Sequence, residues 1–332
     1  MLKDEVLNAL QKADRAGAGK KSVSGAELCR TLGVSRAAVW KAVESLRKEG
    51  YEIEAQSAVG YRLIAAPDRM NAADLRAEEG VVGREVACLE SVDSTNDEIK
   101  RRALAGAQAG LVVTAEAQTA GKGRRGRGFQ SLSGKGLYLS VLLKPDVPLE
   151  QISQLTAWTA VAVCRAVEAV CDVRPQIKWP NDVLVDGKKL CGILTEMGVE
   201  GETGALNYVV VGMGTNVSQT AEDFGPELSE IATSLHILGA NVTRRGLARA
   251  LIAQLDHMNA AFPAGWEEYL EEYRSRCVTL GREVRLIRND WEYRGKAEAL
   301  TEDFRLVVRR QDGMLETVSS GEVSVRGLLG YQ

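Results

Sequence analysis

Hydrophobic and polar positions change their period twice along this chain, and the changes divide it into three parts. In residues 1–65, apolar side chains recur at helical spacing before two short strand-like runs. Residues 69–272 alternate strand-like and helix-like runs, which is typical of a mixed sheet with helices packed on one face. Residues 273–332 carry short alternating strands, which favour a small barrel. We therefore predict an α+β chain with three domains at these boundaries.

The first part has the pattern of a helix-turn-helix followed by a wing. Ser24 and Glu27 form a capping-box pattern that starts one helix. Gly33 permits a tight turn, and Ser35 can cap the next helix. Two helices joined by a short turn with glycine make a helix-turn-helix, and the two strand-like runs that follow could pair as the wing.

The second helix of this motif is the predicted DNA-reading element, because such helices enter the major groove while nearby cations contact phosphates. A small helical interaction module with solvated basic residues is the alternative. Turn, cap and wing signals agree with each other, which favours the DNA interpretation. The predicted DNA contacts are Ser35, Arg36, Ala37, Trp40 and Lys41, with Arg47 and Lys48 near phosphates.

The strongest candidate for a ligand-binding segment is the basic loop, residues 118–127, with the sequence QTAGKGRRGR. Four cations and three glycines fall within its last seven residues. Glycines let backbone N–H groups approach an anion, and arginines supply forked donors for phosphate oxygens. A nucleic-acid patch, a localisation signal or a solvated loop would have the same composition. The Walker-like stretch at 17–22 and the dinucleotide-like stretch at 212–217 each lack a required residue, so an ATP site here would be of another kind.

A second motif, KWPNDVLVDGKKLCG, spans residues 178–192. Asp186 and Gly187 form a strong two-residue hairpin signal. Side chains alternate along a strand, so Lys188 and Lys189 must point to opposite faces, and at most one can face a ligand. A solvated hairpin tip is the alternative for either lysine, and core packing is the alternative for the tryptophan and proline.

Composition narrows the possibilities further. Net charge is −3, so nucleic-acid contact must come from a local basic patch. Two histidines exclude a His-rich zinc site, and no metal site is predicted. Scattered cysteines and a charged N-terminus without a secretory signal fit a reducing cytoplasm. The apolar stretch at 152–164 is too short to cross a bilayer, so we interpret it as a buried helix and expect no membrane contact.

Taken together, the motifs resemble those of the biotin–protein ligases, over essentially the whole chain. The N-terminal LGVSRAA at 32–38 is similar to the bifunctional subgroup, the biotin operon repressors. The stretches that carry the resemblance, in family order and spacing, are STN at 94–96, the basic loop at 118–127, KWPND at 178–182, KLCG at 189–192 and GMGTN at 212–216.

The resemblance implies a winged helix-turn-helix, a central ligase domain and an SH3-like C-terminal domain. It implies an ATP- and Mg²⁺-dependent ligase that forms biotinyl-5′-AMP and transfers biotin to a lysine of the biotin carboxyl carrier protein of acetyl-CoA carboxylase. It also implies a repressor that binds operator DNA as a ligand-promoted homodimer, with the adenylate as corepressor. Biotin's carboxylate is ionised at neutral pH, so attack on ATP needs positioning and cations and no general base.

The resemblance also assigns residues. Lys189 would bridge biotin's carboxylate and the α-phosphate, and Arg124 with Lys122 would face the adenylate phosphate. The attacking lysine must be neutral, and Asp182 is the candidate that orients or deprotonates it. Together Lys189, Arg124 and Asp182 are the predicted catalytic set. Predicted biotin contacts are Ser94, Thr95, Asn96, Gln118, Gly121, Lys122, Gly123, Arg124, Lys189 and Gly192. Predicted nucleotide contacts are Lys122, Arg124, Arg125, Arg127, Phe129, Asn181, Asp182 and Asn216.

The chain departs from the family pattern at four positions. Lys122 stands where arginine is common, Phe129 where tryptophan is common, Gly128 where a larger residue is common and Thr215 where an aliphatic one is usual. One alternative is a ligand-sensing repressor without catalysis, and its only support is the departures at Lys122, Gly128 and Phe129. A lipoate- or octanoyl-transfer enzyme is the other alternative, and the KWPND motif and DNA-binding part argue against it.

Overall fold

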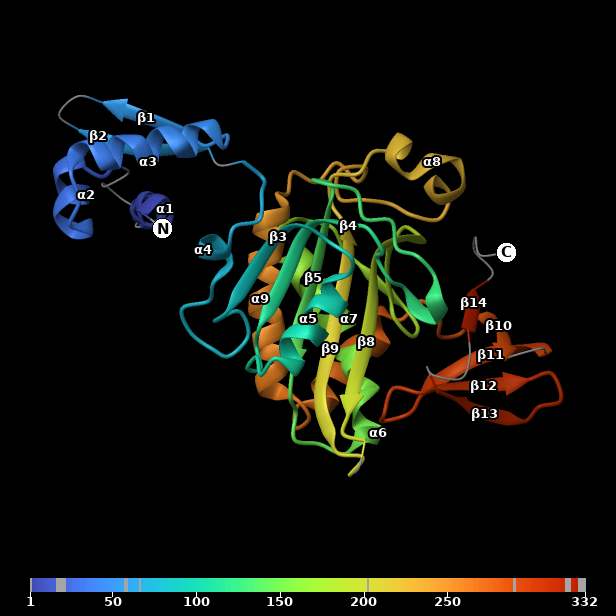
Figure 1. Cartoon of the computed structure of the whole chain (residues 1–332). Helices are drawn as coiled ribbons and strands as arrows, with labels where there is room; N and C mark the ends of the chain where they lie inside the picture. The colour runs from blue at the N-terminus through green and yellow to red at the C-terminus, as the bar shows by residue number, and fades with distance from the viewer. Residues whose placement is uncertain are drawn as a thin grey trace. The chain divides into compact units, whose positions relative to one another are not determined.

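The computed structural model describes residues 2–15, 22–56, 59–65, 67–201, 203–288, 291–319 and 324–327. It contains two compact units, Met1–Asp74 and Leu75–Gln332. Figure 1 labels their elements. The Walker-like stretch at 17–22 lies outside the described residues except for Ser22.

The first unit is a winged helix-turn-helix, as predicted. Ser24 accepts a hydrogen bond from the Glu27 N–H at 3.0 Å, Gly33 ends the helix with a φ of 66°, and Ser35 caps the next one. The wing strands pair antiparallel. The elements are α1 (Leu2–Arg15), α2 (Gly25–Leu32), α3 (Arg36–Lys48), β1 (Glu52–Gln56) and β2 (Gly60–Ala65).

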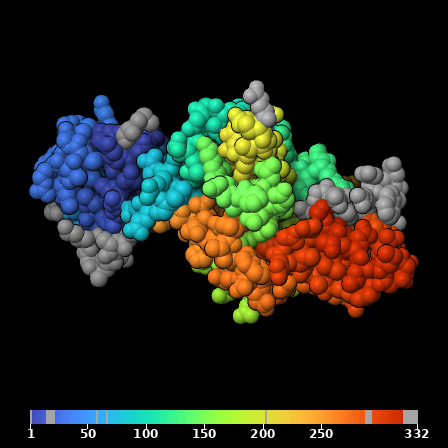
Figure 2. Space-filling view, turned by 90° about the horizontal axis from the view of Figure 1, so that it is seen from below, coloured from blue at the N-terminus to red at the C-terminus, as the bar shows by residue number. Residues whose placement is uncertain are grey.

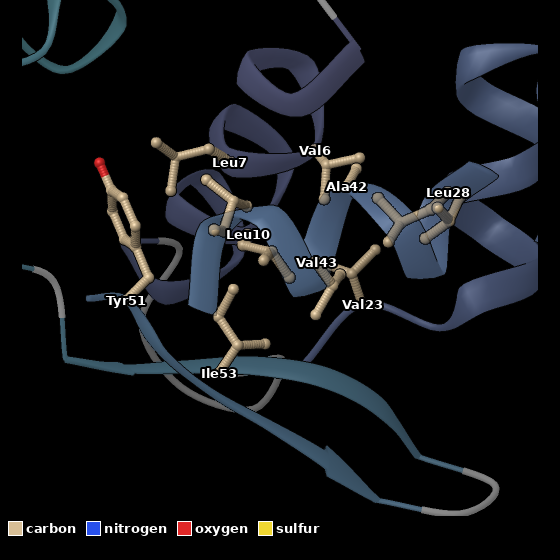
Figure 3. Close-up of a cluster of buried hydrophobic side chains, with 11 residues drawn as sticks. Val6, Leu7, Leu10, Val23, Leu28, Ala42, Val43, Tyr51 and Ile53 are labelled. Carbon is tan, nitrogen blue, oxygen red and sulfur yellow. The ribbon is translucent and has the colours of Figure 1, made fainter. Parts of the chain in front are cut away.

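All of these elements except β2 contribute buried side chains to one apolar cluster, drawn in Figure 3. The wing is also fastened by Arg47, whose Nε donates to the Ile53 carbonyl at 3.0 Å while Nη1 bonds Glu44. The Arg47 guanidinium is therefore engaged inside the unit, and its nearness to DNA phosphates stays a prediction. Labelled cluster members are Val6, Leu7, Leu10, Val23, Leu28, Ala42, Val43, Tyr51 and Ile53.

The second unit is built on a seven-stranded sheet in the order β3-β4-β5-β9-β8-β7-β6. The β3–β4 pair is parallel and the other pairs are antiparallel, so the sheet is mixed, as expected. The strands are β3 (Val86–Val92), β4 (Val112–Gln118), β5 (Gly136–Leu143), β6 (Gln176–Lys178), β7 (Asp182–Val185), β8 (Lys188–Val199) and β9 (Leu206–Asn216).

Helices cover both faces of this sheet, which corrects the expectation of one covered face. In Figure 1, α5 (Thr95–Leu104) lies on the near face, and α7 (Gln154–Glu168) and α9 (Arg244–Ala261) lie behind it. The cause is β5, whose eight residues are all buried and so need apolar cover on both sides. The predicted buried helix is α7, preceded by α6 (Leu149–Ile152). Across the described residues, no helix is long and apolar enough to span a membrane.

The C-terminal strands form a five-stranded antiparallel sheet in the order β13-β12-β11-β10-β14, which confirms a small all-β part. It joins the rest of the unit through Trp179, whose Nε1 donates to the Phe304 carbonyl at 2.9 Å, and through Tyr273, which meets the Phe304 ring edge-on. Figure 2 shows the orange α9–α10 surface directly against these red strands. The bounds are α10 (Trp266–Arg276), β10 (Glu283–Arg288), β11 (Trp291–Leu300), β12 (Leu306–Arg310), β13 (Leu315–Val318) and β14 (Ser324–Gly327).

Candidate functional site

Two adjoining cavities lie at one end of the central sheet, with volumes of about 360 Å³ and 60 Å³. The larger one is enclosed by the basic loop, the 178–182 motif and the segment around α8 (Ala221–Ser229). The smaller one reaches back to the start of α5. They are compartments of one site, because they share five lining residues: Gly123, Arg124, Phe129, Asn181 and Lys189.

The basic loop is a tight hairpin stabilised by its own backbone. The Phe129 N–H donates to the Gly121 carbonyl at 2.8 Å, and the Gly123 N–H donates to the Arg127 carbonyl at 2.7 Å. At the tip, in the short η1 turn (Arg124–Gly126), Arg125 adopts a φ of 59°. This fold sends Arg124 inward and leaves Arg125 and Arg127 exposed at the rim of the larger cavity.

Arg124 is held by Asn181. Its Nη1 donates to Asn181 Oδ1 at 3.1 Å. Asn181 is itself clamped to β8, because its Nδ2 donates to the Ile193 carbonyl and the Ile193 N–H donates back to the Asn181 carbonyl, both at 3.0 Å. Burial lowers the pKa of Arg124, while Asp182 opposes that shift. The guanidinium is therefore a partly desolvated cation, fixed in direction before any ligand arrives.

Lys189 lies beside Arg124 on the cavity wall, with its Nζ 2.5 Å from Oδ1 of Asp182. The predicted divergence of the two lysines is confirmed, since Lys188 donates instead to the Ser229 carbonyl at 2.8 Å. Asp186 and Gly187 have φ values of 49° and 77°, as a type I′ hairpin turn requires. All three predicted catalytic residues thus line one cavity.

The smaller cavity is lined by polar side chains that already bond one another. Gln118 Oε1 accepts two hydrogen bonds from Thr95, one from its backbone N–H at 2.8 Å and one from its side-chain hydroxyl at 3.1 Å. Gln118 Nε2 donates to the Ser131 hydroxyl. Asn96 accepts from Ser140 at 2.6 Å and donates to Glu196 at 2.8 Å. Asn96 therefore lines the cavity with both ends of its amide in use, and Ser94 lies beside it.

Two predicted contacts sit differently from the rest. Lys122 lines the smaller cavity and pairs with Asp97 at 2.6 Å, whereas the other predicted nucleotide contacts line the larger one. Gly121 does not line either of these two cavities, and a Cβ there would come within 2.5 Å of the Phe129 carbonyl oxygen. Its glycine is needed for this close backbone approach.

Three further glycines make room for site side chains. A Cβ at Gly192 would lie 2.9 Å from Lys189 Nζ, and one at Gly214 would lie 2.6 Å from the Phe129 ring. At Gly212 it would come within 2.1 Å of Asn96 Oδ1. The GMGTN stretch thus resembles a dinucleotide-binding motif in sequence only, because it lies on strand β9. Its glycines clear space on a strand, while Asn216 donates to the Lys189 carbonyl at 3.3 Å.

No sequence motif predicted the apolar wall of the larger cavity. The segment after α8 runs alongside Lys189, whose N–H donates to the Ile231 carbonyl at 2.8 Å. The one local signal was the capping box of Thr220 and Asp223, which starts α8. An apolar wall in a cavity that is also lined by five cationic residues suits a ligand that joins a flat ring to phosphate. The wall residues are Phe224, Leu228, Ile231 and Ala232.

The predicted DNA contacts lie together at the start of α3. Arg36, Ala37, Trp40 and Lys41 are exposed, and the Trp40 side chain is 55% exposed. Ser35 is exposed too, but its hydroxyl accepts the cap hydrogen bond from Ala38 at 3.2 Å. A large exposed aromatic between two cations is typical of a binding surface.

Comparisons with known proteins agree along the chain. The biotin/lipoate A/B protein ligase family matches residues 88–216, an HTH domain matches 18–62, and the biotin protein ligase C-terminal domain matches 279–326. The bifunctional ligase/repressor BirA of Bacillus spizizenii is 35% identical over 314 residues, covering 91% of this chain and 94% of that protein. BirA of Escherichia coli is 31% identical over 307 residues, covering 91% and 92%.

A solved structure gives the same picture. The biotin protein ligase from Aquifex aeolicus in complex with biotin and ATP superposes with a TM-score of 0.63 at 28% identity, covering 74% of this chain and 99% of that one.

Proposed function

We infer that this chain, which belongs to the family of bifunctional biotin–protein ligases and repressors, activates biotin with ATP and represses transcription in response to biotin. The observation that carries the proposal is the meeting of Arg124, Lys189 and Asp182 at one cavity with an apolar wall. Biotin occupies the smaller compartment and the nucleotide the larger one, with the reacting carboxylate and α-phosphate where they join.

In the first step, biotin's carboxylate attacks the α-phosphate of ATP, giving biotinyl-5′-AMP and diphosphate. Lys189 bridges the two reacting groups, and Arg124 faces the phosphate. Both cations lie at the boundary of the two compartments, which is where negative charge accumulates in the transition state. Ser94, Thr95, Gln118 and Gly192 orient biotin, and Asn216 and Phe129 contact the nucleotide.

Magnesium enters this step with ATP. The described residues contain no cluster of three metal-binding side chains. Mg²⁺ commonly uses one or two carboxylates together with substrate phosphates, and Asp182 supplies a carboxylate in the lining of the larger cavity. The residues therefore fit a nucleotide-bound ion, which would neutralise charge on the phosphates. What the chain itself contributes is the placement of Asp182 beside Lys189.

In the second step, a lysine of the biotin carboxyl carrier protein attacks the mixed anhydride, forming an amide and releasing AMP. The attacking amine must be neutral, and Asp182 orients it or accepts its proton. The carrier is the protein partner of this step, and biotin leaves the site covalently attached to it. Mixing ATP, labelled biotin and a carrier protein with the chain tests both steps together, since label must appear on the carrier only when ATP is present.

The proposed repressor activity depends on DNA binding by the first unit. Arg36, Ala37, Trp40 and Lys41 read operator DNA from the exposed start of α3. One such motif presents few base-reading side chains, so operator binding uses a homodimer with two half-sites. The sheet of the second unit supplies the dimer edge, where Met197 and Val199 at the end of β8 are exposed apolar residues. Biotinyl-5′-AMP is the corepressor that promotes this dimer.

The same proposal includes the division into domains at 1–65, 69–272 and 273–332, and each family match falls within one of them. Helix α10 runs across the last of these boundaries. We also propose that the protein is cytoplasmic. The support for this location is that none of the six cysteines, all of which lie in described segments, forms a disulfide.

A further inference from the structure

Lys122 is the first cation of the basic loop, and its ammonium pairs with α5. Its Nζ lies 2.6 Å from Oδ2 of Asp97, in the first turn of that helix. Lys122 lines the smaller cavity, whereas Arg125 and Arg127 line the larger one and Arg124 lines both. Lys122 therefore lines the smaller cavity with its ammonium already paired to a carboxylate.

Asp97 is held in place by a row of alternating charges. Its Oδ1 accepts from Lys100 at 3.2 Å, and Lys100 donates to Oε1 of Glu196 on β8 at 2.6 Å. The second oxygen of Glu196 accepts from Asn96 at 2.8 Å. Because Asp97 is already fixed by Lys100, it loses little side-chain entropy when it binds Lys122. The row links the basic loop to the central sheet.

The position of Lys122 in the loop allows this ion pair to restrain the whole hairpin. Lys122 and Gly128 form an isolated β-bridge at the base of the hairpin. Hydrogen bonds from Phe129 to Gly121 and from Gly123 to Arg127 flank the bridge. A side chain fixed at this point restrains both limbs of the hairpin, and with them the Arg124 side chain at its tip.

We infer that Lys122 and Asp97 form an anchor that holds the basic loop over the biotin compartment, and that Lys122 is a positioning residue and not a phosphate ligand. The inference rests on the proposed function, since the ligand retained is biotinyl-5′-AMP. It also gives a physical reason for the departure at position 122. An ammonium is a compact point charge suited to one carboxylate oxygen, whereas the fork of an arginine suits two oxygens of a phosphate.

The test uses Lys122→Met and Asp97→Asn, which remove the ion pair with little change in size, and the double variant. The full chain is loaded with labelled biotin and ATP, excess unlabelled biotin is added, and the release rate of labelled adenylate is measured. The two side chains are 45% and 23% exposed, so the pair is weak, and each single variant should speed release about two- to fivefold. The double variant should release adenylate no faster than the single variants.

Two variants serve as controls. Lys122→Arg keeps a cation at the position and should release adenylate at the wild-type rate. Glu98→Gln breaks ion pairs to Arg101 and Arg102 within the same helix and keeps the Lys122–Asp97 pair, so it should also leave release unchanged. An effect of Glu98→Gln equal to that of Asp97→Asn would show that general weakening of α5 explains the result, which would overturn the anchor.

A phosphate ligand would behave differently from an anchor. In that case Lys122→Met alone would slow adenylate formation by about 10²–10³ while Asp97→Asn had little effect. Effects that multiply in the double variant would also contradict the anchor. A second measurement does not depend on adenylate: trypsin should cut the ligand-free loop after Arg124, Arg125 or Arg127 faster in both single variants. If the wild type forms no adenylate, the proposed function fails while this cleavage still decides the anchor, and unchanged cleavage rules it out.

Discussion

Lys188 and Lys189 are neighbours on β8, yet Lys188 donates to the Ser229 carbonyl at 2.8 Å while Lys189 lies 2.5 Å from Asp182 at the cavity. Strand alternation alone separates the two ammonium groups. They therefore form a matched pair of the same chemistry, in which only the second faces the site.

The first prediction uses this pair. Lys189→Ala should slow adenylate formation by about 10²–10³, because it removes a cation from a partly desolvated charged site. Lys188→Ala should change the rate by less than about threefold, since the loss is one hydrogen bond to a backbone carbonyl. Diphosphate release measures both rates, and circular dichroism checks that both variants fold. Equal effects would mean that Lys189 has no special role.

The second prediction concerns the basic loop. Biotin and ATP together should protect the loop from trypsin, because the adenylate phosphate gives Arg124 a second partner beside Asn181. Arg124→Gly should raise escape of the reactive adenylate about tenfold or more, seen as labelling of bystander proteins. Arg127→Gly, at the exposed rim, should raise it much less. Trypsin cleavage at the same rate with and without ligand would contradict the proposal that the loop closes on the adenylate.

The third prediction concerns DNA. Biotin plus ATP should tighten operator binding, unbiotinylated carrier protein should weaken it, and deletion of residues 1–65 should abolish it. Arg36→Ala should weaken specific binding by about 1–3 kcal/mol if this side chain reads a base edge. Gel-shift titrations with each ligand measure these changes at fixed salt. Identical operator affinity under all conditions would contradict the proposed response of the repressor to biotin, and it would not contradict the proposed ligase activity.

The fourth prediction concerns stability. Glu116 on β4 and Arg244 at the start of α9 are joined at 2.6 Å with side chains only 8% and 3% exposed. Glu116→Ala should lower the free energy of unfolding by about 3–5 kcal/mol, because it leaves a buried charge without this partner. Glu298→Gln, which breaks an exposed ion pair to Arg309, should change it far less. Urea denaturation measures both, and similar losses would show that burial of the first pair has no special weight.

The fifth prediction concerns thiol reactivity. Burial raises the pKa of Cys191 to about 12, so its thiol stays neutral and inert through pH 9, because only the thiolate reacts. Cys29, Cys88 and Cys171 are half-buried and should label first with an alkylating reagent. Mass spectrometry of peptides after brief labelling at pH 8 gives the order. Early labelling of Cys191 in the native protein would mean that this part of β8 opens readily.

Local signals were enough for the elements of the first unit. Ser24, Gly33 and Ser35 act at the helix ends where the sequence predicted them, since capping and a positive φ depend on near neighbours in the chain. The hairpin at Asp186 and Gly187 is equally local, and so is the separation of Lys188 from Lys189. Every biotin or nucleotide contact that the family motifs predicted, except Gly121, lines one of the two cavities.

The tertiary structure alone decided how those residues are used. The partner of Lys122 is Asp97, 25 positions earlier in the sequence, and no local pattern pairs two charges across a loop and a helix. The apolar wall of Phe224 and Ile231 belongs to the site because the chain returns beside Lys189 after α8. Sequence period determines which way a side chain points on its own element. What it meets there depends on long-range packing, which is set only when the whole core assembles.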